Sequence, residues 1–280
     1  MKKSILCLGL ILILAGFLCS CGKNQQSSSE TSASTLPKET QADSTYESSN
    51  TETSSVDKSF KADNFVKDGQ FINYVENGHT KTIQGIDVSE YNTDIDFQTV
   101  KNEGIDFVMV RLGGRGYGDS GALYPDKKAL EYIESAKSAG LKVGGYFFSQ
   151  AINETEAEEE AEYVINLLED VTLDMPIGFD WETIKEDTAR TDNLDNQSLT
   201  DCAAAFCRKI NGTGKYSSII YAKADVFSRY NKNDLADCNF WFSEYADKPS
   251  VTEGYSMWQY SESAEINGIG TTDLNLCFIN

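Results

Sequence analysis

Strand-like apolar runs alternate with segments of helical spacing over most of the chain from Gln84 onward. Five runs read as strands: "QGIDVS", "DFVMVRLGG", "LKVGGYFFS", "MPIGFDWE" and "SSIIYA". The segments between them repeat apolar residues with the helical period: "DIDFQTVKNEG", "PDKKALEYIESAKSAG", "NETEAEEEAEYVINLLED" and "SLTDCAAAFCRKING". After the fifth strand the helical spacing fades, and three further strands are predicted at "NFWFSEYA", "GYSMWQYS" and "TTDLNLCFI".

This alternation predicts an α/β fold with parallel strands and right-handed crossovers. A complete eight-fold β/α barrel takes about 250 residues, whereas residues 84–280 number 197. The length favours a shortened TIM-like barrel of five β/α units followed by three β-strands. A doubly wound open sheet is the competing topology.

The first residues have the pattern of a secretory signal peptide: two lysines, a short apolar run and small residues before a cysteine. The stretch "LCSC" resembles the bacterial lipobox, in which the last cysteine receives a lipid after the leader is removed. We therefore expect export, and a lipid anchor at Cys21 on the outer face of a bacterial cell membrane, facing the cell wall. The alternative is an ordinary signal peptide with another cleavage site nearby.

Composition divides the rest of the chain. From Cys21 to about Ser59 it is rich in Ser, Thr and Glu, which predicts a disordered tether. The runs "QFINYV" and "HTKTIQ" on either side of "ENG" predict a short hairpin. The expected organisation is a signal peptide at 1–20, a lipidated tether at 21–59, a lead-in hairpin at 60–83 and a catalytic domain at 84–280.

Charge and residue counts exclude several classes of function. A formal net charge of −20 argues against nucleic-acid binding, since phosphate contacts need a basic surface. His79 is the one histidine and lies before the main domain, so neither a Ser-His-Asp triad nor a histidine-rich zinc site is expected. No cofactor and no metal are expected, and carboxylates and tyrosines remain for acid/base chemistry. The pairing of the cysteines beyond the anchor stays open between two disulfides and free thiols: Cys202, Cys207, Cys238 and Cys277.

Four carboxylates fall at predicted strand ends. Asp180 and Glu182 lie two apart in "GFDWE", so they share one face of the strand while Trp181 takes the other. In a barrel this end is the C-terminal mouth, where active sites of this architecture gather. Asp87 holds the same place on the first strand, and Asp273 lies on the last strand, which a closed barrel brings beside the first.

Such a group of acids beside aromatic residues suits the cleavage of a glycosidic bond. One acid gives a proton to the leaving oxygen while another stabilises positive charge at the sugar carbon. Six aromatic residues on or near strand ends are candidates to pack against sugar rings: Tyr146, Tyr221, Trp241, Tyr245, Trp258 and Tyr260.

At these residues the chain resembles the family 25 glycoside hydrolases, the lysozymes that cut peptidoglycan between N-acetylmuramic acid and N-acetylglucosamine. The match runs in order through "GIDVSEYN", "IDFQTVKNEGIDFVMVRLG", "AGLKVGGYFFSQA", "PIGFDWE", "IIYA", "WFSEY", "MWQYS" and "TDLN". The resemblance implies cleavage with retention and without a metal. It assigns Glu182 as the general acid and Asp180 as the carboxylate that assists the acetamido group of the substrate or stabilises the charged intermediate. By the same resemblance Asp87, Asp273 and Tyr146 line the cleft.

Some positions depart from the commoner pattern of this family. Glu90 and Tyr91 stand where many members have "HH", Phe147 stands in "YFFS" where "YHFS" is frequent, and Glu244 adds a carboxylate near the mouth. The four acids are intact, so these changes bear on substrate preference more than on chemistry.

The sequence therefore predicts an exported, membrane-tethered muramidase, expected to be a monomer, whose partners are peptidoglycan strands and a membrane. Two alternatives remain. One is a glycan-binding lipoprotein that has lost useful catalysis, and the other is a structural or partner-binding surface protein.

Overall fold

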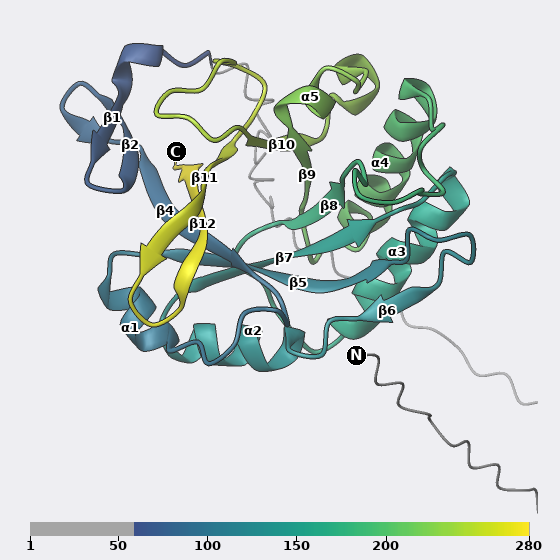
Figure 1. Ribbon diagram of the computed structural model, residues 1–280, viewed down its shortest axis with the longest axis horizontal. Coiled ribbons are helices and arrows are strands. Elements are labelled where there is room, and N and C mark those ends of the chain that lie inside the picture. The colour runs from purple at the N-terminus through teal and green to yellow at the C-terminus, as the bar shows by residue number, and fades with distance from the viewer. Residues whose placement is uncertain (1–58, 280) are drawn as a thin grey trace, which may run out of the picture. The chain divides into compact units, whose positions relative to one another are not determined.

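The computed structural model describes residues 59–279, and eight of its strands close into a barrel (Figure 1). The predictions on the signal peptide, Cys21 and the tether lie outside these residues. The barrel strands, in chain order, are β4 (Thr82–Val88), β5 (Phe107–Arg115), β7 (Lys142–Ser149), β8 (Ile177–Trp181), β9 (Ser218–Lys223), β10 (Asn239–Ser243), β11 (Met257–Ile266) and β12 (Gly270–Phe278).

The closure of the barrel settles the topology. Neighbouring strands from β4 through to β11 pair in parallel, whereas β12 is antiparallel to both β11 and β4. Because β4 pairs with β5 on one side and with β12 on the other, the eight strands form a closed ring. A short ninth strand, β6 (Leu123–Pro125), pairs antiparallel with the end of β5 outside this ring. The prediction of a shortened TIM-like barrel is confirmed, and the open doubly wound sheet is wrong.

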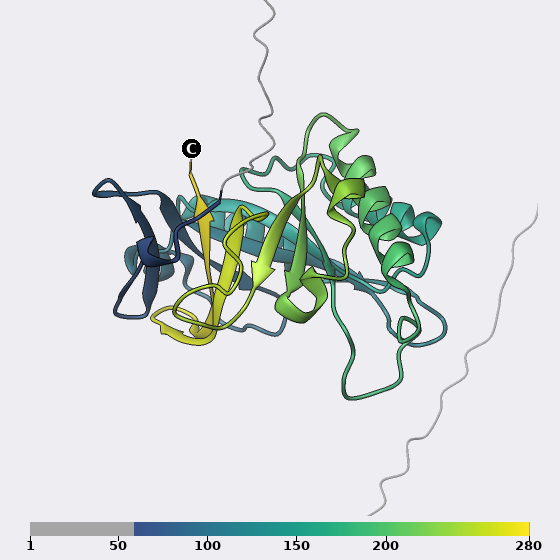
Figure 2. The same ribbon diagram turned by 90° about the horizontal axis from the view of Figure 1, so that it is seen from above.

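The helices lengthen from the first to the fourth and then give way to single turns, in agreement with the fading of helical spacing after the fifth strand. The structure has α1 (Phe97–Asn102), α2 (Ala129–Ser138), α3 (Glu154–Leu167), α4 (Asn196–Asn211), the single turn α5 (Ala224–Phe227) and two 3-10 turns, η1 (Ala62–Asn64) and η2 (Lys232–Leu235). Side-chain caps fix three of the helix starts, because Asp96, Asn153 and Asp195 each accept a hydrogen bond from a backbone N–H of the first turn. Figures 1 and 2 show α3 and α4 side by side on one flank of the barrel.

The lead-in forms a small antiparallel sheet of its own. Its strands are β1 (Phe65–Asp68), β2 (Phe71–Glu76) and β3 (His79–Thr80), in the order β1-β2-β3. Asn77 and Gly78 join β2 to β3 with φ of 52° and 77°, the left-handed pair that an Asn-Gly hairpin turn requires. Thus the region has one strand more than the expected hairpin.

This lead-in sheet covers part of the barrel wall that has no helix over it. The described segments that join β10, β11 and β12 contain no helix of their own, so the outer faces of these strands need another cover. Phe60 stacks on Phe278 at 3.9 Å between ring centroids, and Phe65 meets Trp258 edge-on at 5.3 Å. Both views show the lead-in sheet on the side of the barrel away from α3 and α4 (Figures 1 and 2).

The interior of the barrel is filled by side chains below the mouth. Apolar and aromatic residues form this inner core: Phe107, Met109, Ile219, Tyr221, Trp241 and Met257. Gly85 is required beside them, because a Cβ at this position would lie 2.3 Å from the ring of Phe107. The filled lower half leaves the mouth as the place where polar side chains collect.

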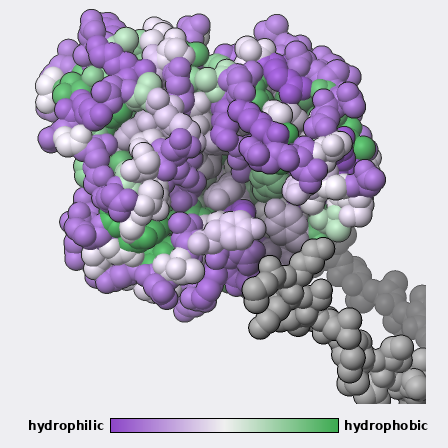
Figure 3. All heavy atoms as spheres, in the orientation of Figure 1, coloured by the Kyte–Doolittle hydropathy of each residue, from purple (hydrophilic) through white to green (hydrophobic). Residues whose placement is uncertain are grey.

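The surface is mostly polar on the face that Figure 3 shows, with apolar residues in scattered patches. Cys202, Cys207, Cys238 and Cys277 are all free thiols in the described part of the chain. Within residues 59–279, no helix combines the length and the apolar character needed to cross a membrane.

Candidate active site

The four predicted acids meet at the C-terminal mouth of the barrel. Asp87 lies one residue before the end of β4, Asp180 lies one residue before the end of β8, and Glu182 follows β8 directly. Asp273 on β12 makes a side-chain hydrogen bond with Asp87. The charge of Glu182 acts on each of the other three carboxyl groups, which shows that they share one electrostatic environment.

Asp180 is the most enclosed of these acids. Its residue surface is 6% exposed, and Oδ1 has no hydrogen-bond partner among the described residues. Burial raises the pKa of Asp180 well above its ordinary value, and the neighbouring charge of Glu182 raises it further. An oxygen that is buried without a donor is free to accept a hydrogen bond from a ligand.

Asp87 and Asp273 behave as a carboxyl pair. Burial raises the pKa of both groups, and the charge of Asp87 adds to the rise at Asp273, whose pKa reaches about 8. A hydrogen bond between two carboxyl groups needs a proton on one of them. Asp273 is the better place for that proton, because amide donors favour the ionised form of Asp87.

Two buried amides hold Asp87. Gln259 Nε2 donates to Asp87 Oδ2 at 2.9 Å, and Asn275 Nδ2 donates to the same oxygen at 2.7 Å. The amide of Asn275 is oriented in turn by Trp241, whose Nε1 donates to Asn275 Oδ1 at 2.8 Å. Hence the inner core below the mouth fixes the position of an acid above it.

Hydroxyl groups orient the other amide. Oε1 of Gln259 accepts hydrogen bonds from Tyr221 at 2.9 Å, from Ser243 at 2.8 Å and, at the rim, from Tyr245 at 3.4 Å. With Oε1 held by donors, Nε2 must point toward Asp87. Neither Gln259 nor Asn275 stands out in the sequence, because a buried amide has no motif of its own. The position of Gln259 is the one available signal. It lies between Trp258 and Tyr260 on β11, so it must point to the opposite face of the strand from these two aromatic residues.

Glu182 is accessible and has a basic neighbour. Its side chain is 26% exposed and forms an ion pair with Lys223, the last residue of β9. Its backbone carbonyl accepts a hydrogen bond from Gln150 Nε2 at 3.1 Å, and Thr191 donates to Oε1 of the same amide at 2.7 Å. The backbone that carries Glu182 is thus fixed from below while its carboxylate faces the opening.

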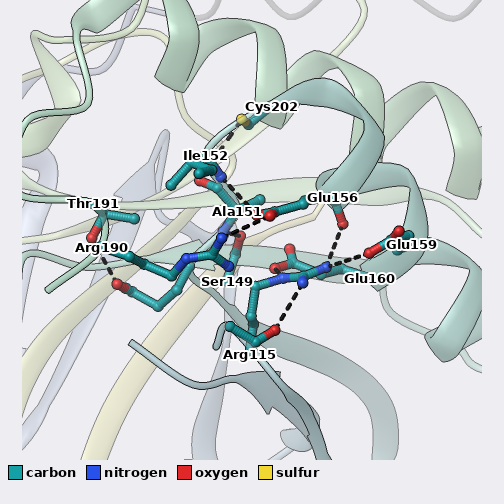
Figure 4. Close-up of polar contacts among 12 residues, drawn as sticks. Arg115, Ser149, Ala151, Ile152, Glu156, Glu159, Glu160, Arg190, Thr191 and Cys202 are labelled. Carbon is teal, nitrogen blue, oxygen red and sulfur yellow. Dashed lines mark hydrogen bonds and ion pairs between the residues drawn. The ribbon is translucent and has the colours of Figure 1, made fainter. Parts of the chain in front are cut away.

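A buried polar cluster supports the loops of the mouth (Figure 4). Arg115 Nε donates to Glu160 at 2.8 Å, and Arg190 pairs with Glu156 at 2.7 Å. Burial raises the pKa of Glu160 to about 7, against the lowering effect of its hydrogen bonds, which include that from Arg115. Both glutamates belong to α3, so this helix ties down the end of β5 and the loop that follows β8.

Four of the six predicted aromatic residues lie with the acids. Tyr221 and Tyr146 both meet the ring of Trp241 edge-on, at centroid distances of 5.0 and 6.1 Å. Tyr146 also faces Asp87 and Asp180, whose charges raise its pKa further beyond the effect of burial. Tyr245 stands at the rim with 44% of its surface exposed.

Trp258 and Tyr260 do not lie in the cleft, contrary to the prediction. Because neighbours on a strand point to opposite faces, the inward position of Gln259 sends both of them outward. Trp258 packs against Phe65 of the lead-in sheet, and Tyr260 donates a hydrogen bond to Gln84 Oε1 at 2.6 Å. Both residues belong to the packing between barrel and lead-in.

Comparisons with known proteins agree with this geometry. The sequence profile described as "Glycosyl hydrolases family 25" matches residues 86–269. The autolytic lysozyme of Clostridium acetobutylicum is 26% identical over 204 residues, which cover 69% of this chain and 55% of that protein. The chain therefore spans about half the length of this curated relative.

Solved structures show the same fold. The modular autolysin LytC from Streptococcus pneumoniae superposes with a TM-score of 0.62 at 25% identity, over 76% of this chain and 52% of that one. That protein is also known in complex with a synthetic peptidoglycan ligand. The spore cortex lytic enzyme SleM from Clostridium perfringens superposes with a TM-score of 0.61 at 21% identity, over 72% and 69% of the two chains.

Proposed function

Because the chain belongs to glycosyl hydrolase family 25, we propose that its cleft hydrolyses the β-1,4 bond between N-acetylmuramic acid and N-acetylglucosamine in peptidoglycan. The observation that carries the proposal is the group of four carboxyl groups at the barrel mouth, with Asp180 buried and Glu182 open to the cleft. The autolytic lysozyme and the peptidoglycan-bound autolysin support the choice of substrate.

In the first step, the acetamido oxygen of the substrate attacks the sugar carbon C1 while the bond from C1 to the leaving oxygen breaks. Glu182 gives its proton to that leaving oxygen. Asp180 acts in its ionised form: it accepts the N–H of the acetamido group and stabilises the positive charge that develops beside it, and this positive charge offsets the burial that raises the pKa of Asp180 in the free protein. In the second step, a water molecule attacks C1 and the bond from C1 to the acetamido oxygen breaks, while Glu182 takes up the proton that the water loses; two inversions retain the configuration at C1.

Lys223 has to move before this cycle can begin. Its ammonium group pairs with Glu182, and an acid that donates a proton cannot at the same time be the anion of an ion pair. The side chain of Lys223 is 41% exposed, so it has room to swing into solvent when a substrate enters.

The same ion pair supports a second candidate, a protein that binds peptidoglycan strands and cleaves them poorly. If Lys223 stays in place when glycan is bound, Glu182 remains ionised and the cleft acts as a binding groove. The two candidates differ in the fate of Lys223 and not in the ligand.

Product analysis separates the two candidates. The purified protein is incubated with purified peptidoglycan, new reducing ends are labelled by borohydride reduction, and the fragments are identified by mass. The proposal predicts new ends on muramic acid. Fragments with new ends on glucosamine would contradict the proposed bond, and bound but uncleaved glycan would favour the second candidate.

We further propose that the enzyme works on the wall while anchored by a lipid on Cys21. The support is the sequence pattern before this residue and the cell-wall substrate of the family, since Cys21 is outside the described residues. Replacing Cys21 with Ser is expected to move the protein from the membrane fraction to the soluble fraction of cells. An unchanged membrane fraction would contradict the anchor.

A further inference from the structure

Two of the four cysteines in the described part of the chain face each other. Cys207 lies on α4 and is 1% exposed, whereas Cys238 lies directly before β10 and is partly exposed. The largest influence on the ionisation of each thiol is the other thiol, through a side-chain hydrogen bond in which Cys207 is the donor. Two sulfur atoms in such contact are placed for a covalent bond between them.

The strand register explains why these two residues meet. The first residue of β10 pairs with Ile219 of β9, so Cys238 lies beside Ser218, the first residue of β9. The side chain of Cys207 also lies against Ser218. The backbone N–H of Ser218 donates to Asn211 Oδ1 at 2.9 Å, which ties the start of β9 to the end of α4. Helix and sheet therefore place the two sulfur atoms on either side of one serine.

The segment that leads to Cys238 is fixed on α4. The backbone N–H of Asn231 donates to Thr200 Oγ1, a side chain of α4, at 3.1 Å. The backbone N–H of Cys238 donates to the carbonyl oxygen of Leu235 at 2.9 Å, which continues the turn η2 up to the cysteine. Both thiols are thus held in contact while they are still reduced.

The two thiols differ in reactivity. The hydrogen bond to Cys238, together with burial, raises the pKa of Cys207, whereas the same hydrogen bond lowers the pKa of Cys238. The thiolate is the form that attacks a disulfide, and a reactive thiol must also be accessible. Cys238 meets both conditions, and the buried Cys207 is placed to react with it in a second step.

The other two cysteines have no such arrangement. The Cys202 thiol donates to the carbonyl oxygen of Ala151 at 3.9 Å, and the Cys277 thiol donates to that of Phe278 at 3.6 Å. Cys202 lies five positions before Cys207 on α4, so the two point to different sides of the helix. Cys202 and Cys277 therefore serve as matched controls.

We propose that Cys207 and Cys238 form a disulfide bond when the protein meets a disulfide oxidant, as in an oxidising compartment outside the cytoplasm. The Cys238 thiolate attacks one sulfur atom of the oxidant, whose other sulfur leaves as a thiol. Cys207 then loses its proton and attacks the Cys238 sulfur of this mixed disulfide, and the second thiol leaves. Two protein thiols and one oxidant disulfide become one protein disulfide and two small thiols. This inference does not depend on the proposed function.

The position of the bond gives it a structural role. It closes a loop of about 30 residues that contains all of β9. The last residue of β9 is Lys223, which pairs with Glu182. A cross-link lowers the conformational entropy of the unfolded chain, so it stabilises the part of the barrel that lies beside the catalytic acid.

Peptide mapping tests the bond itself. Full-length protein is incubated with excess oxidised glutathione, alkylated without reduction, digested and analysed by mass, beside a sample kept in dithiothreitol. We expect a peptide pair that joins Cys207 to Cys238, with Cys202 and Cys277 alkylated. Alkylation of both Cys207 and Cys238, a glutathione retained on Cys238, or a different pairing would overturn the proposal.

Thermal unfolding tests its structural role. The oxidised wild type is expected to unfold about 5–10 °C above the reduced protein. Cys207→Ala and Cys238→Ser should each abolish this difference, whereas the double variant Cys202→Ala and Cys277→Ser should keep it. If the buried change at Cys207 impairs folding, Cys238→Ser at the partly exposed position carries the comparison. Equal unfolding temperatures in the two wild-type samples, or a difference that persists in Cys238→Ser, would show that this bond does not stabilise the fold.

Discussion

The carboxyl pair of Asp87 and Asp273 lowers the stability of the fold as the pH rises. Burial and the charge of Asp87 raise the pKa of Asp273 to about 8. Between its unfolded value near 4 and this folded value, the folded protein binds more protons than the unfolded chain. The free energy of unfolding therefore falls as pH rises through this window.

Replacing Asp273 with Asn removes this proton and keeps a donor for Asp87. We expect the free energy of unfolding of Asp273→Asn to fall less than that of the wild type between pH 4 and pH 8. At pH 8 the variant should unfold at a higher temperature than the wild type. Thermal unfolding at several pH values measures both effects. Equal pH dependence in the two proteins would show that Asp273 ionises freely.

The amide of Gln259 is expected to matter for both stability and rate. Its replacement by Met leaves Asp87 short of one donor and leaves three hydroxyl groups without their shared acceptor. We expect a loss of about 1–3 kcal/mol in the free energy of unfolding and a lower kcat. Chemical denaturation and steady-state kinetics measure these changes. Gln70→Met, a change at an exposed amide bonded to a backbone carbonyl, should stay within about 0.5 kcal/mol of the wild type.

At the residue scale, the sequence predicts charged groups better than their supports. The spacing of Asp180 and Glu182 on a strand is enough to place both at the mouth. It cannot reveal Gln259 or Lys223, because their roles depend on which strands become neighbours. Trp258 and Tyr260 were misplaced because an aromatic residue near a strand end fits a cleft or a packed outer face equally well, and only the strand's alternation decides.

At the element scale, the lead-in sheet acts as a replacement for missing helices. Phe65 is 4% exposed and meets Tyr74 and Trp258 edge-on at 5.0 and 5.3 Å. The lead-in sheet precedes residues 86–269, the segment that the family profile matches. It therefore lies outside the part of the chain that the profile describes.

We expect Phe65→Ala to lower the free energy of unfolding by about 3–5 kcal/mol, because it opens a cavity between the lead-in and β11. The neighbouring Val66 is 48% exposed, and Val66→Ala should change the free energy of unfolding by less than about 0.5 kcal/mol. Denaturant unfolding of both variants makes the comparison. Similar small losses in the two would mean that the lead-in is not packed on the barrel as described.

The strength of the pattern explains which elements were predictable. All eight barrel strands were found because each has an apolar run bounded by turn or helix signals. β1 and β6 were missed because they are short, with four and three residues, and β1 buries only one of its residues. Pairing with a longer neighbour, and not an alternating pattern, makes them strands.

At the scale of the whole molecule, closure of the barrel creates the site. The pairing of β12 with β4 brings Asp273 to Asp87 across most of the length of the domain, and the parallel strands bring Asp180 and Glu182 to the same rim. No local property of the sequence brings these four acids together, so their meeting could be expected only after the barrel itself was predicted.

The most direct test of the proposed catalysis is the rate at which Glu182→Gln releases fragments from purified peptidoglycan, measured beside the wild type. We predict a loss of at least about 10²–10⁴-fold, the usual contribution of a general acid, with unchanged thermal unfolding and retained binding of glycan. A variant that folds, binds and cleaves at the rate of the wild type would contradict the assignment of Glu182 and the mechanism built on it.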